Sequence, residues 1–509
     1  MTDTSPAAGD LGKRKFLIAA CLIVMAGLAL NVAGNWVGLD LGVLLFPQHL
    51  DISTVVMGGP MPHPFYGPLS YYVYAVPAMA AAKVRALFVH EPAPEMWLHQ
   101  VGRVICGLLG AATVLLVMVI ARMGLSRKAA LIAGFLAAFS PGMVFMFHGE
   151  SVNAVMTFFA VAACAAMAWL AYAPRERIIQ WGLVAISGGL AATAKESCYG
   201  LMPGGLTGVF LARLAPIRPD FKKILLFVGK AAAVGGVAFA VYWTVNLSLF
   251  FPYQLNRHLD HYTPSEDASR LSEAEVERRS PEGPVLYFGM VEQNLGPSTV
   301  IWFALGTFIL MRGRGGRALG YLFICVALVH YLTFGLWVHW FTYPSRGLKP
   351  YDVLFVSAIA AVPAAAALEC IWSARKRMWR IPGRIIAVLV LSSVAVSGIA
   401  VDLALLHPSV TAPLRAVKEM PDRITLYEGI DVNLEKTAWV MEKVSPATRQ
   451  DAQYALLVAT DEEVQGMLNE GYEVRAEFSM PWQARLAPPG FRLQRPLLLL
   501  ERPEILSNE

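Results

Sequence analysis

The sequence predicts a mainly α-helical protein that crosses a membrane about eleven times and ends in a small α+β domain. Of the 509 residues, 56% are hydrophobic and only 16% are charged, whereas a water-soluble protein carries about a quarter charged residues. Apolar stretches recur along the first 406 residues, and roughly 20 apolar residues are needed to span a bilayer. Beyond residue 407 the sequence becomes polar and charged. These observations predict a polytopic membrane protein.

The expected spans are separated by loops whose charge alternates along the chain. Their approximate positions are 16–34, 103–121, 129–148, 153–173, 179–194, 199–212, 224–249, 297–311, 318–339, 351–372 and 385–406. Every second loop is basic, at residues 13–15, 122–128, 175–177, 213–223, 312–317 and 375–384. Because cytoplasmic loops are enriched in Lys and Arg, this alternation predicts a cytoplasmic N-terminus and an extracytoplasmic C-terminus.

The apolar stretch 66–89 is expected to lie at the membrane interface rather than to cross the bilayer. It contains Pro77, Lys83 and Arg85, and counting it as a span would place the next basic loop on the outer side. We therefore expect juxtamembrane helices within a first outer loop of residues 35–102. A second long outer loop is expected at residues 250–296.

Residues 1–406 are expected to form the transmembrane domain, and residues 407–509 a small soluble α+β domain outside the membrane. Strand-like runs occur at 454–459, 472–478 and 497–500, and a helical pattern lies at 461–469. The sequence does not indicate whether this domain binds an acceptor or covers a cavity.

Several function classes are disfavoured by composition and motifs. A net charge of +5 without clustered basic faces does not favour nucleic-acid binding. The six cysteines lie in or beside apolar runs and include no Cys-x-x-Cys pair, which disfavours a disulfide framework and thiol redox chemistry. No P-loop, dinucleotide-binding or His-Glu-x-x-His motif is present, so the sequence does not indicate the use of a cytoplasmic nucleotide.

Asp40 is the candidate general base, because it directly follows the first expected span at the outer interface. A carboxylate there can accept a proton from an acceptor hydroxyl or amine within hydrogen-bond reach. The alternative interpretation is a helix N-cap or an interfacial charge. Asp51 is a second candidate, although Asp51-Ile-Ser-Thr also has the pattern of a helix start.

Two further polar groups lie at the expected outer ends of spans. Glu150 and Asn153 follow the span at 129–148, and polar groups at such depth are functional candidates by default. A short external turn is an equally good explanation for them. Lys195 and Glu196 end the span at 179–194, where a cation is unusual on the outer side. A bound phosphate would explain Lys195, as would pairing with Glu196 or an interfacial lysine head group.

Two cations, Arg346 and Lys349, lie in a short outer loop after His339. Arg can bind phosphate oxygens through two parallel hydrogen bonds, so this loop suits an anionic lipid head group. Anchoring to ordinary anionic lipid explains the same residues. His258 and His261 could hold a divalent metal with a neighbouring carboxylate, but an interfacial aromatic turn explains them better. No cofactor is otherwise indicated.

The order and spacing of these motifs resemble the GT-C integral-membrane glycosyltransferases, namely the protein O-mannosyltransferase and lipid A aminoarabinose transferase superfamily. The resemblance covers about residues 10–400. An acidic residue follows the first span, and a His-Pro-Pro-Leu-Tyr-Tyr-like run appears as 63–72. A block beginning at Arg103 is followed by a polar pair near Glu150, and a Gly-rich span ends in Lys195. A late Arg-x-x-x-Pro loop matches 346–350.

The resemblance implies an inverting transfer of a sugar from a polyprenyl-phosphate donor at the periplasmic face of a bacterial inner membrane. It implies Asp40 as the base and Glu150 as a group that orients donor or acceptor. The implied donor-phosphate ligands are Lys195, Arg346 and Lys349. The implied substrate contacts are His63, Tyr66, Asn153, Glu196 and His339. The acceptor would be a lipid, a glycan or a protein of the cell envelope.

Two other functions are compatible with the same features. A transporter or flippase for a lipid-linked sugar would also carry a basic outer loop and buried polar residues, but secondary transporters favour inverted repeats, and the sequence has none. A non-catalytic scaffold of an envelope-assembly complex could use residues 407–509 to bind partners. An Asp40→Asn variant separates these functions, because it abolishes sugar transfer only if the protein is an enzyme.

Overall fold

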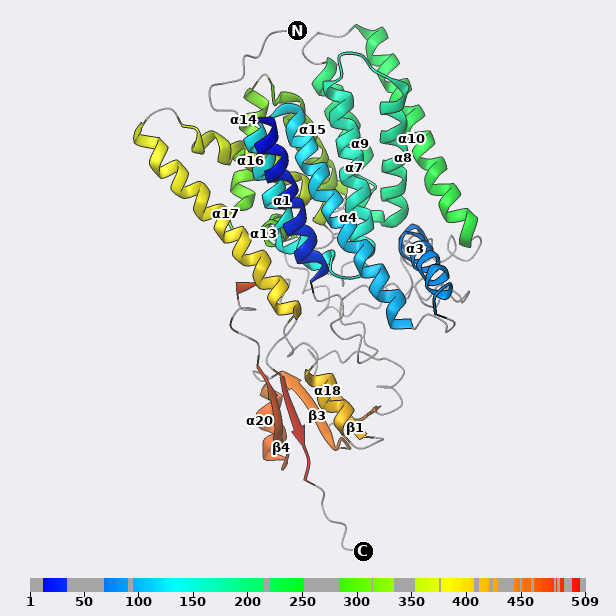
Figure 1. Cartoon of the computed structure of the whole chain (residues 1–509), viewed down its shortest axis with the longest axis vertical. Coiled ribbons are helices and arrows are strands. Elements are labelled where there is room, and N and C mark those ends of the chain that lie inside the picture. Colours follow the sequence, from blue (N-terminus) through cyan, green and yellow to red (C-terminus); the bar gives the residue numbers. More distant parts are fainter. Residues whose placement is uncertain are drawn as a thin grey trace, which may run out of the picture. The chain divides into compact units, whose positions relative to one another are not determined.

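A computed structural model divides the chain into two compact units (Figure 1). The first unit holds the helices up to residue 399, and the second holds the sheet and its helices from residue 400 onward. The structure describes residues 12–33, 68–89, 95–214, 220–250, 283–313, 315–333, 353–374, 377–406, 412–420, 424–428, 444–448, 451–458, 462–479, 482, 486–488 and 497–503.

Six of the described helices are long and apolar enough to cross a membrane. They are α1 (Lys13–Val32), α4 (Glu95–Gly124), α7 (Val152–Tyr172), α10 (Phe221–Phe250), α16 (Leu354–Trp372) and α17 (Arg377–Leu406). Three shorter apolar helices are α8 (Ile178–Ala194), α9 (Leu201–Leu214) and α15 (Arg317–His330). The predicted class, a mainly helical polytopic membrane protein, is confirmed, whereas the count of eleven spans stays a prediction.

Two of the expected spans differ in the structure from the sequence-based prediction. One is divided into two helices, and the other is preceded by a sharply bent helix. The span at 129–148 consists of α5 (Arg127–Ala138) and α6 (Pro141–Met146). Pro141 has no N–H to continue the first helix, and Ser140 Oγ accepts from Met143 N to start the second. The span at 297–311 is preceded by α13 (Gly283–Leu295), which meets α14 (Thr299–Arg312) at a bend of 97°. Gly296 permits this bend through its φ of 104°.

The interior of the first unit is formed by α7 and α16, which are buried along most of their length, whereas α1 and α10 expose most of theirs. Small residues allow close helix contacts, as is common in membranes. On α9, a Cβ atom at Gly204 would lie 2.8 Å from Cys325 O, and one at Gly208 would lie 2.6 Å from Leu322 Cα. Helices α9 and α15 are therefore packed almost backbone to backbone.

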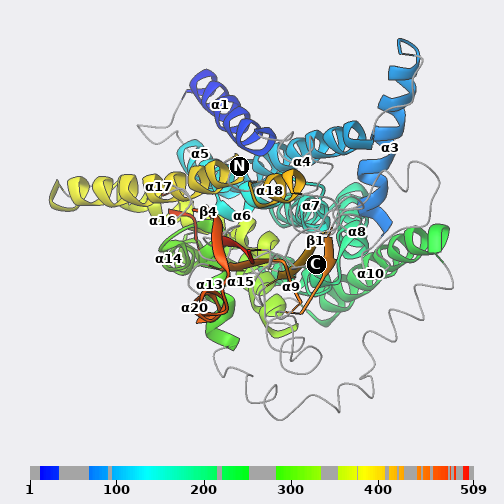
Figure 2. The same cartoon turned by 90° about the horizontal axis from the view of Figure 1, so that it is seen from below.

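Helix α3 (Pro68–Ala86) lies transverse to its neighbours. It is viewed nearly along its axis in Figure 1 and from its side in Figure 2, and it contacts α4, α7, α8 and α10. It lies within the first expected outer loop and is helical as predicted, whereas residues 95–102 of that expected loop belong to the beginning of α4. Its buried face carries Ser70, Tyr71 and Tyr74.

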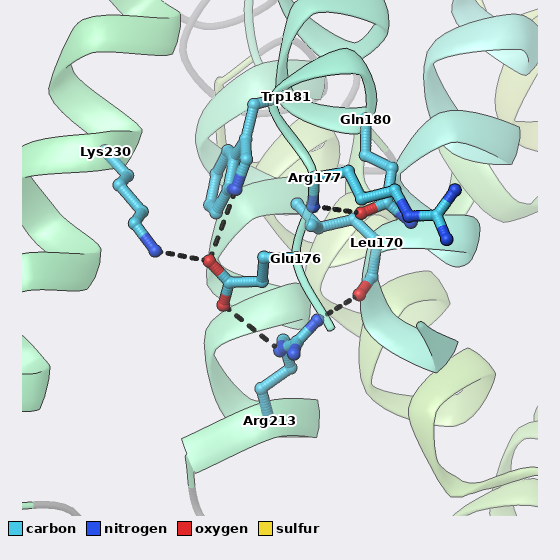
Figure 3. Close-up of polar contacts among 7 residues, drawn as sticks. All are labelled: Leu170, Glu176, Arg177, Gln180, Trp181, Arg213 and Lys230. Atoms are coloured by element: carbon cyan, nitrogen blue, oxygen red, sulfur yellow. Dashed lines mark hydrogen bonds and ion pairs between the residues drawn. The ribbon is translucent and has the colours of Figure 1, made fainter. Parts of the chain in front are cut away.

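At the basic loop between α7 and α8, the Glu176 carboxylate joins three other segments (Figure 3). Its Oε2 lies 2.5 Å from Lys230 Nζ on α10 and accepts from Trp181 Nε1 at 3.3 Å, and its Oε1 lies 3.4 Å from Arg213 Nε on α9. Partial burial raises the pKa of Glu176, but hydrogen bonds and charges from Lys230, Arg213 and Trp181 outweigh burial and hold that pKa below its usual value. This cluster ties the ends of α7, α8, α9 and α10 together.

The second unit contains a five-stranded sheet with the order β2-β1-β3-β5-β4. Strand β1 pairs in parallel with β2 and β3, and β5 pairs antiparallel with β3 and β4. The strands are β1 (Ile424–Glu428), β2 (Val444–Pro446), β3 (Tyr454–Val458), β4 (Glu473–Phe478) and β5 (Leu497–Glu501). The strand-like runs and the helical pattern read from the sequence correspond to β3, β4, β5 and α20 (Glu462–Asn469).

Side-chain alternation along the strands gives this sheet two apolar faces. Tyr454 and Leu456 pack with α18 (Ala412–Glu419) on one face. Ala455 and Leu457 pack with α20 on the other. The sheet is therefore covered by a helix on each side, which the sequence did not indicate because α18, β1 and β2 were not recognised.

Candidate functional site

A buried group of polar side chains lies where α3, the first part of α4, the α6–α7 turn and the end of α8 meet. These segments contact one another in the first unit, and Figure 1 shows α3 beside α4 and α8 at one end of the helical bundle. We call this group the polar cluster, and its members are Tyr74, His99, Arg103, Glu150, Asn153 and Lys195. Each of these side chains is buried.

Glu150 lies in the turn between α6 and α7 and pairs with a histidine from α4. Its Oε1 is 3.3 Å from His99 Nδ1, and the two side chains are at most 1% exposed. Ser151 caps α7 by accepting from Asn153 N at 3.2 Å, so Glu150 directly precedes the helix. Within the described part of the chain, neither Glu150 Oε2 nor His99 Nε2 has a hydrogen-bond partner. A buried pair of this kind is costly unless something satisfies its remaining atoms.

Lys195 ends α8 and points back towards the start of α7. Its Nζ donates to Asn153 Oδ1 at 2.9 Å, and the residue is 6% exposed. A buried ammonium in a membrane protein is expensive unless it faces a polar site or an anion. The two predicted site residues Lys195 and Asn153 are therefore in contact. The side chain of Glu196 lies outside the described residues.

Tyr74 and Arg103 complete the polar cluster. Tyr74 OH donates to Ser151 O at 3.0 Å and lies 3.5 Å from Cys106 Sγ, so it joins α3 to α4 and to the α6–α7 turn. Arg103 is fully buried and lies one helical turn after His99, on the same face of α4. From the sequence alone, no role was assigned to Tyr74 or His99, and Arg103 was noted only as the first residue of a motif. The i, i+4 spacing of His99 and Arg103 in an otherwise apolar helix was the signal that could have found them.

The electrostatic character of the polar cluster favours an anion. With histidines neutral, its side chains contribute two cations, Arg103 and Lys195, and one carboxylate, Glu150. Arginine and lysine side chains can bind phosphate or carboxylate oxygens through charge-assisted hydrogen bonds, which are stronger than neutral ones. The arrangement can therefore bind an acidic group beside a carboxylate that accepts hydrogen bonds.

Most of the other predicted site residues lie outside the described residues. These are Asp40, Asp51, His63, Tyr66, His258, His261, His339, Arg346 and Lys349. Among the described residues, no group of three or more His, Cys, Asp and Glu side chains could hold a metal ion. Of the predicted site residues, the structure brings together Glu150, Asn153 and Lys195 at one end of the helical unit.

Comparison with known families identifies the segment that carries the polar cluster. Residues 98–243 match the family model of dolichyl-phosphate-mannose-protein mannosyltransferases. Over this segment the chain is similar to that family. The match includes His99, Arg103, Glu150, Asn153 and Lys195, and it confirms the resemblance read from the sequence. No curated protein matched the chain by sequence.

Several solved structures are also similar to this chain. The oligosaccharyltransferase of Archaeoglobus fulgidus in its apo form has a TM-score of 0.49 at 14% identity, and the match covers 82% of this chain and 63% of that one. ArnT from Cupriavidus metallidurans bound to undecaprenyl phosphate has a TM-score of 0.46 at 13% identity, with 97% and 99% covered. The chain thus spans less than two thirds of the archaeal enzyme.

Proposed function

We propose that this protein is an inverting glycosyltransferase that moves a sugar from a polyprenyl-phosphate donor to an acceptor of the cell envelope. The observation that carries the proposal is the polar cluster, in which Lys195 donates to Asn153 three residues after the buried Glu150, inside the segment matched to the mannosyltransferase family. That family is named for a lipid-phosphate-linked sugar as donor and a protein as acceptor. The acceptor here is a lipid, a glycan or a protein.

The proposed reaction forms one bond and breaks one bond at the anomeric carbon of the sugar. An acceptor hydroxyl or amine attacks that carbon from the face opposite the phosphate, and the carbon–oxygen bond to the phosphate breaks. The phosphate leaves with the electron pair, so cations where this charge develops lower the barrier. Lys195 supplies one such cation, and Arg346 and Lys349 are proposed to supply others.

The acceptor loses its proton during this attack, and a carboxylate is needed to take it. Asp40 is proposed as this general base. Glu150, which keeps Oε2 without a partner among the described residues, is proposed to accept a hydrogen bond from a sugar or acceptor hydroxyl. His63, Tyr66, Glu196 and His339 are proposed to complete the substrate contacts. The reaction is proposed to take place at the periplasmic face of a bacterial inner membrane.

An apolar cavity in the same unit supports a lipid-linked substrate. It has a volume of about 360 Å³ and lies between α13, α14, α15 and α16, with Phe288, Phe308 and Tyr331 in its wall. Ligand sites occupy roughly 300–1,000 Å³. Phe288 and Phe308 are also among the exposed apolar side chains, so the cavity adjoins a lipid-facing surface. A hydrocarbon chain is the occupant that such a wall favours.

The decisive experiment is sugar transfer by the purified protein in lipid nanodiscs. Polyprenyl-phosphate sugars are supplied with envelope extracts, and the products are analysed by mass spectrometry. We expect a transferred sugar from the wild type, and a loss of transfer in Asp40→Asn and Lys195→Met. Lys223→Met removes an exposed cation beside Asp220 and is the matched control, which is expected to stay active.

The outcomes separate the three functions. Movement of the intact lipid-linked sugar across the bilayer without transfer would identify a flippase. Loss of an assembled envelope complex in a deletion strain, with all glycolipids and glycoproteins unchanged in mass, would identify a scaffold. A sugar missing from one glycolipid or glycoprotein in that strain would name both the sugar and the acceptor.

A further inference from the structure

The contact between His99 and Glu150 has no part in the proposed reaction as described so far. The imidazole comes from α4, and the carboxylate comes from the turn before α7. Their sequence separation is 51 residues, and His99 Nδ1 to Glu150 Oε1 measures 3.3 Å. The pair therefore fixes the first part of one helix against the entry to another, in the middle of the polar cluster.

His99 and Glu150 form one contact with each other, and each has one further polar side-chain atom outside that contact. An ionised carboxylate is acceptor-only, so Glu150 Oε1 requires the N–H form of His99 Nδ1. This contact occupies Oε1 and fixes the orientation of the carboxylate plane. Glu150 Oε2 and His99 Nε2 have no hydrogen-bond partner among the residues that the structure describes. Buried polar atoms in this state are uncommon in native proteins and call for a physical explanation.

We propose that His99 is a positioning residue for sugar transfer, which holds Glu150 through Nδ1 so that Oε2 remains directed at the substrate. This inference rests on the proposed function and adds a residue to it. A carboxylate that orients a substrate must be held within about 0.5 Å of its productive position by a supporting hydrogen bond. His99 provides that bond from a rigid helix, and its own side chain is fully buried.

Two amide substitutions separate the roles of the two imidazole nitrogens. In His99→Asn, the side-chain NH₂ takes approximately the place of Nδ1 and can still donate to Glu150 Oε1. In His99→Gln, the longer side chain carries its NH₂ to the region of Nε2 and leaves Oε1 without its donor. Both variants are neutral amides, so differences between them report position rather than charge.

The test measures kcat and the donor KM for both variants in nanodiscs, beside Glu150→Gln and the double variant His99→Gln/Glu150→Gln. We expect His99→Gln to lower kcat by about 10–100-fold, as supporting hydrogen bonds to site residues do. The KM for the donor should stay within about threefold, since Lys195 still binds the phosphate. His99→Asn should keep most of the wild-type kcat.

Comparing the kcat of the double variant with that of Glu150→Gln distinguishes this positioning role from a purely structural one. If His99 acts through Glu150, the double variant should be no slower than Glu150→Gln alone. Independent losses that multiply would overturn the inference. So would a His99→Asn variant as slow as His99→Gln, or a His99→Gln variant with wild-type kcat. Should His99→Gln fail to accumulate in the membrane, His99→Asn decides the matter, because it lacks the imidazole and must remain active.

The result for the wild type separates this inference from the function on which it rests. A wild type that transfers no sugar from any donor overturns the proposed function and this role with it. An active wild type combined with any of the contradicting results above overturns only the role of His99.

Discussion

At the scale of single residues, the polar cluster depends on neutral partners that hold its charges in place. Asn153 accepts from Lys195 Nζ at 2.9 Å, and its position at the start of α7 is fixed by the Ser151 cap. A neutral acceptor such as this amide oxygen orients the ammonium without forming an ion pair with it.

Replacing Asn153 with Leu removes this acceptor at nearly constant volume. We expect the KM for the lipid-phosphate donor to rise about tenfold, because a loss of about 1.4 kcal/mol in binding corresponds to that factor. Steady-state kinetics over a range of donor concentrations measure the change. Asn153→Asp, which places a carboxylate against Lys195, should raise the KM further, and an unchanged KM in both variants would contradict the role given to Asn153.

Tyr74 offers a second test at this scale, because its hydroxyl joins α3 to the α6–α7 turn through Ser151 O. Tyr74→Phe keeps the buried ring and removes that bond together with the weaker contact to Cys106 Sγ. Hydrogen bonds between membrane helices contribute about 0.6 kcal/mol on average, so a small loss of stability is expected. Thermal unfolding in detergent measures it. Tyr72→Phe on the same helix is the control, and an equal loss there would show that the effect is not specific to Tyr74.

At the scale of elements, short helices depend on close packing with a partner. Gly208→Val on α9 would push a side chain into the backbone of α15, where Leu322 Cα lies 2.6 Å from the new Cβ. Overpacking of this kind costs about 1–3 kcal/mol, so we expect a lower unfolding temperature. Gly236→Val on α10, where nothing lies within 4 Å of an added Cβ, is the matched control and should unfold close to the wild type.

The Glu176 cluster makes the attachment of α10 depend on pH. Since the pKa of Glu176 is held below its usual value, mainly by Lys230 against the opposing effect of burial, its contribution to stability is full above about pH 4.3, the ordinary glutamate value. That contribution is lost as the pH falls through the lower folded-state pKa.

Glu176→Gln should therefore destabilise the protein at pH 7 by no more than about 1 kcal/mol, because solvent screens a partly exposed pair. The difference from the wild type should shrink as the pH is lowered through this range. Unfolding curves of the two proteins between neutral and acidic pH measure it. A difference that grows towards acidic pH would contradict the assigned sign.

At the scale of the whole molecule, the alternation of basic loops makes a prediction about topology. Lys223 and Trp482 are both exposed and are expected on opposite sides of the membrane. In intact cells, a membrane-impermeant maleimide should label Trp482→Cys and should label Lys223→Cys only after lysis. The unmodified chain, which contains exposed Cys21 and Cys370, provides the background. Labelling of both variants in intact cells would refute the topology.

Hydrophobic length and charge alternation were enough to predict the class of the fold and the places of most helices. They missed the interruption between α5 and α6 and the bend before α14, because Pro141 and Gly296 act through local backbone geometry rather than hydropathy. In the second unit, β3 and β5 were visible as apolar runs, whereas polar Thr425 and Glu428 interrupt β1 and β2 has only three residues.

The candidate site was less predictable from the sequence than the fold. Glu150, Asn153 and Lys195 could be found because each is a polar residue at the end of an apolar run. The contact between Lys195 and Asn153 depends on how α7 meets α8, which hydropathy does not encode. Tyr74 looks ordinary in the sequence, since only its burial and its partner distinguish it.

The close contact between α9 and α15 also bears on how the protein is made. A helix of 14 residues, such as either of these, rises only about 21 Å at 1.5 Å per residue, against a hydrocarbon thickness of about 30 Å. More than a hundred residues separate the two in the chain, so the ribosome completes α9 long before its partner emerges. Until α15 is inserted, the face of α9 that carries Gly204 and Gly208 therefore lacks the helix against which it packs. Nascent chains truncated between the two helices should be the forms that quality-control proteases remove fastest.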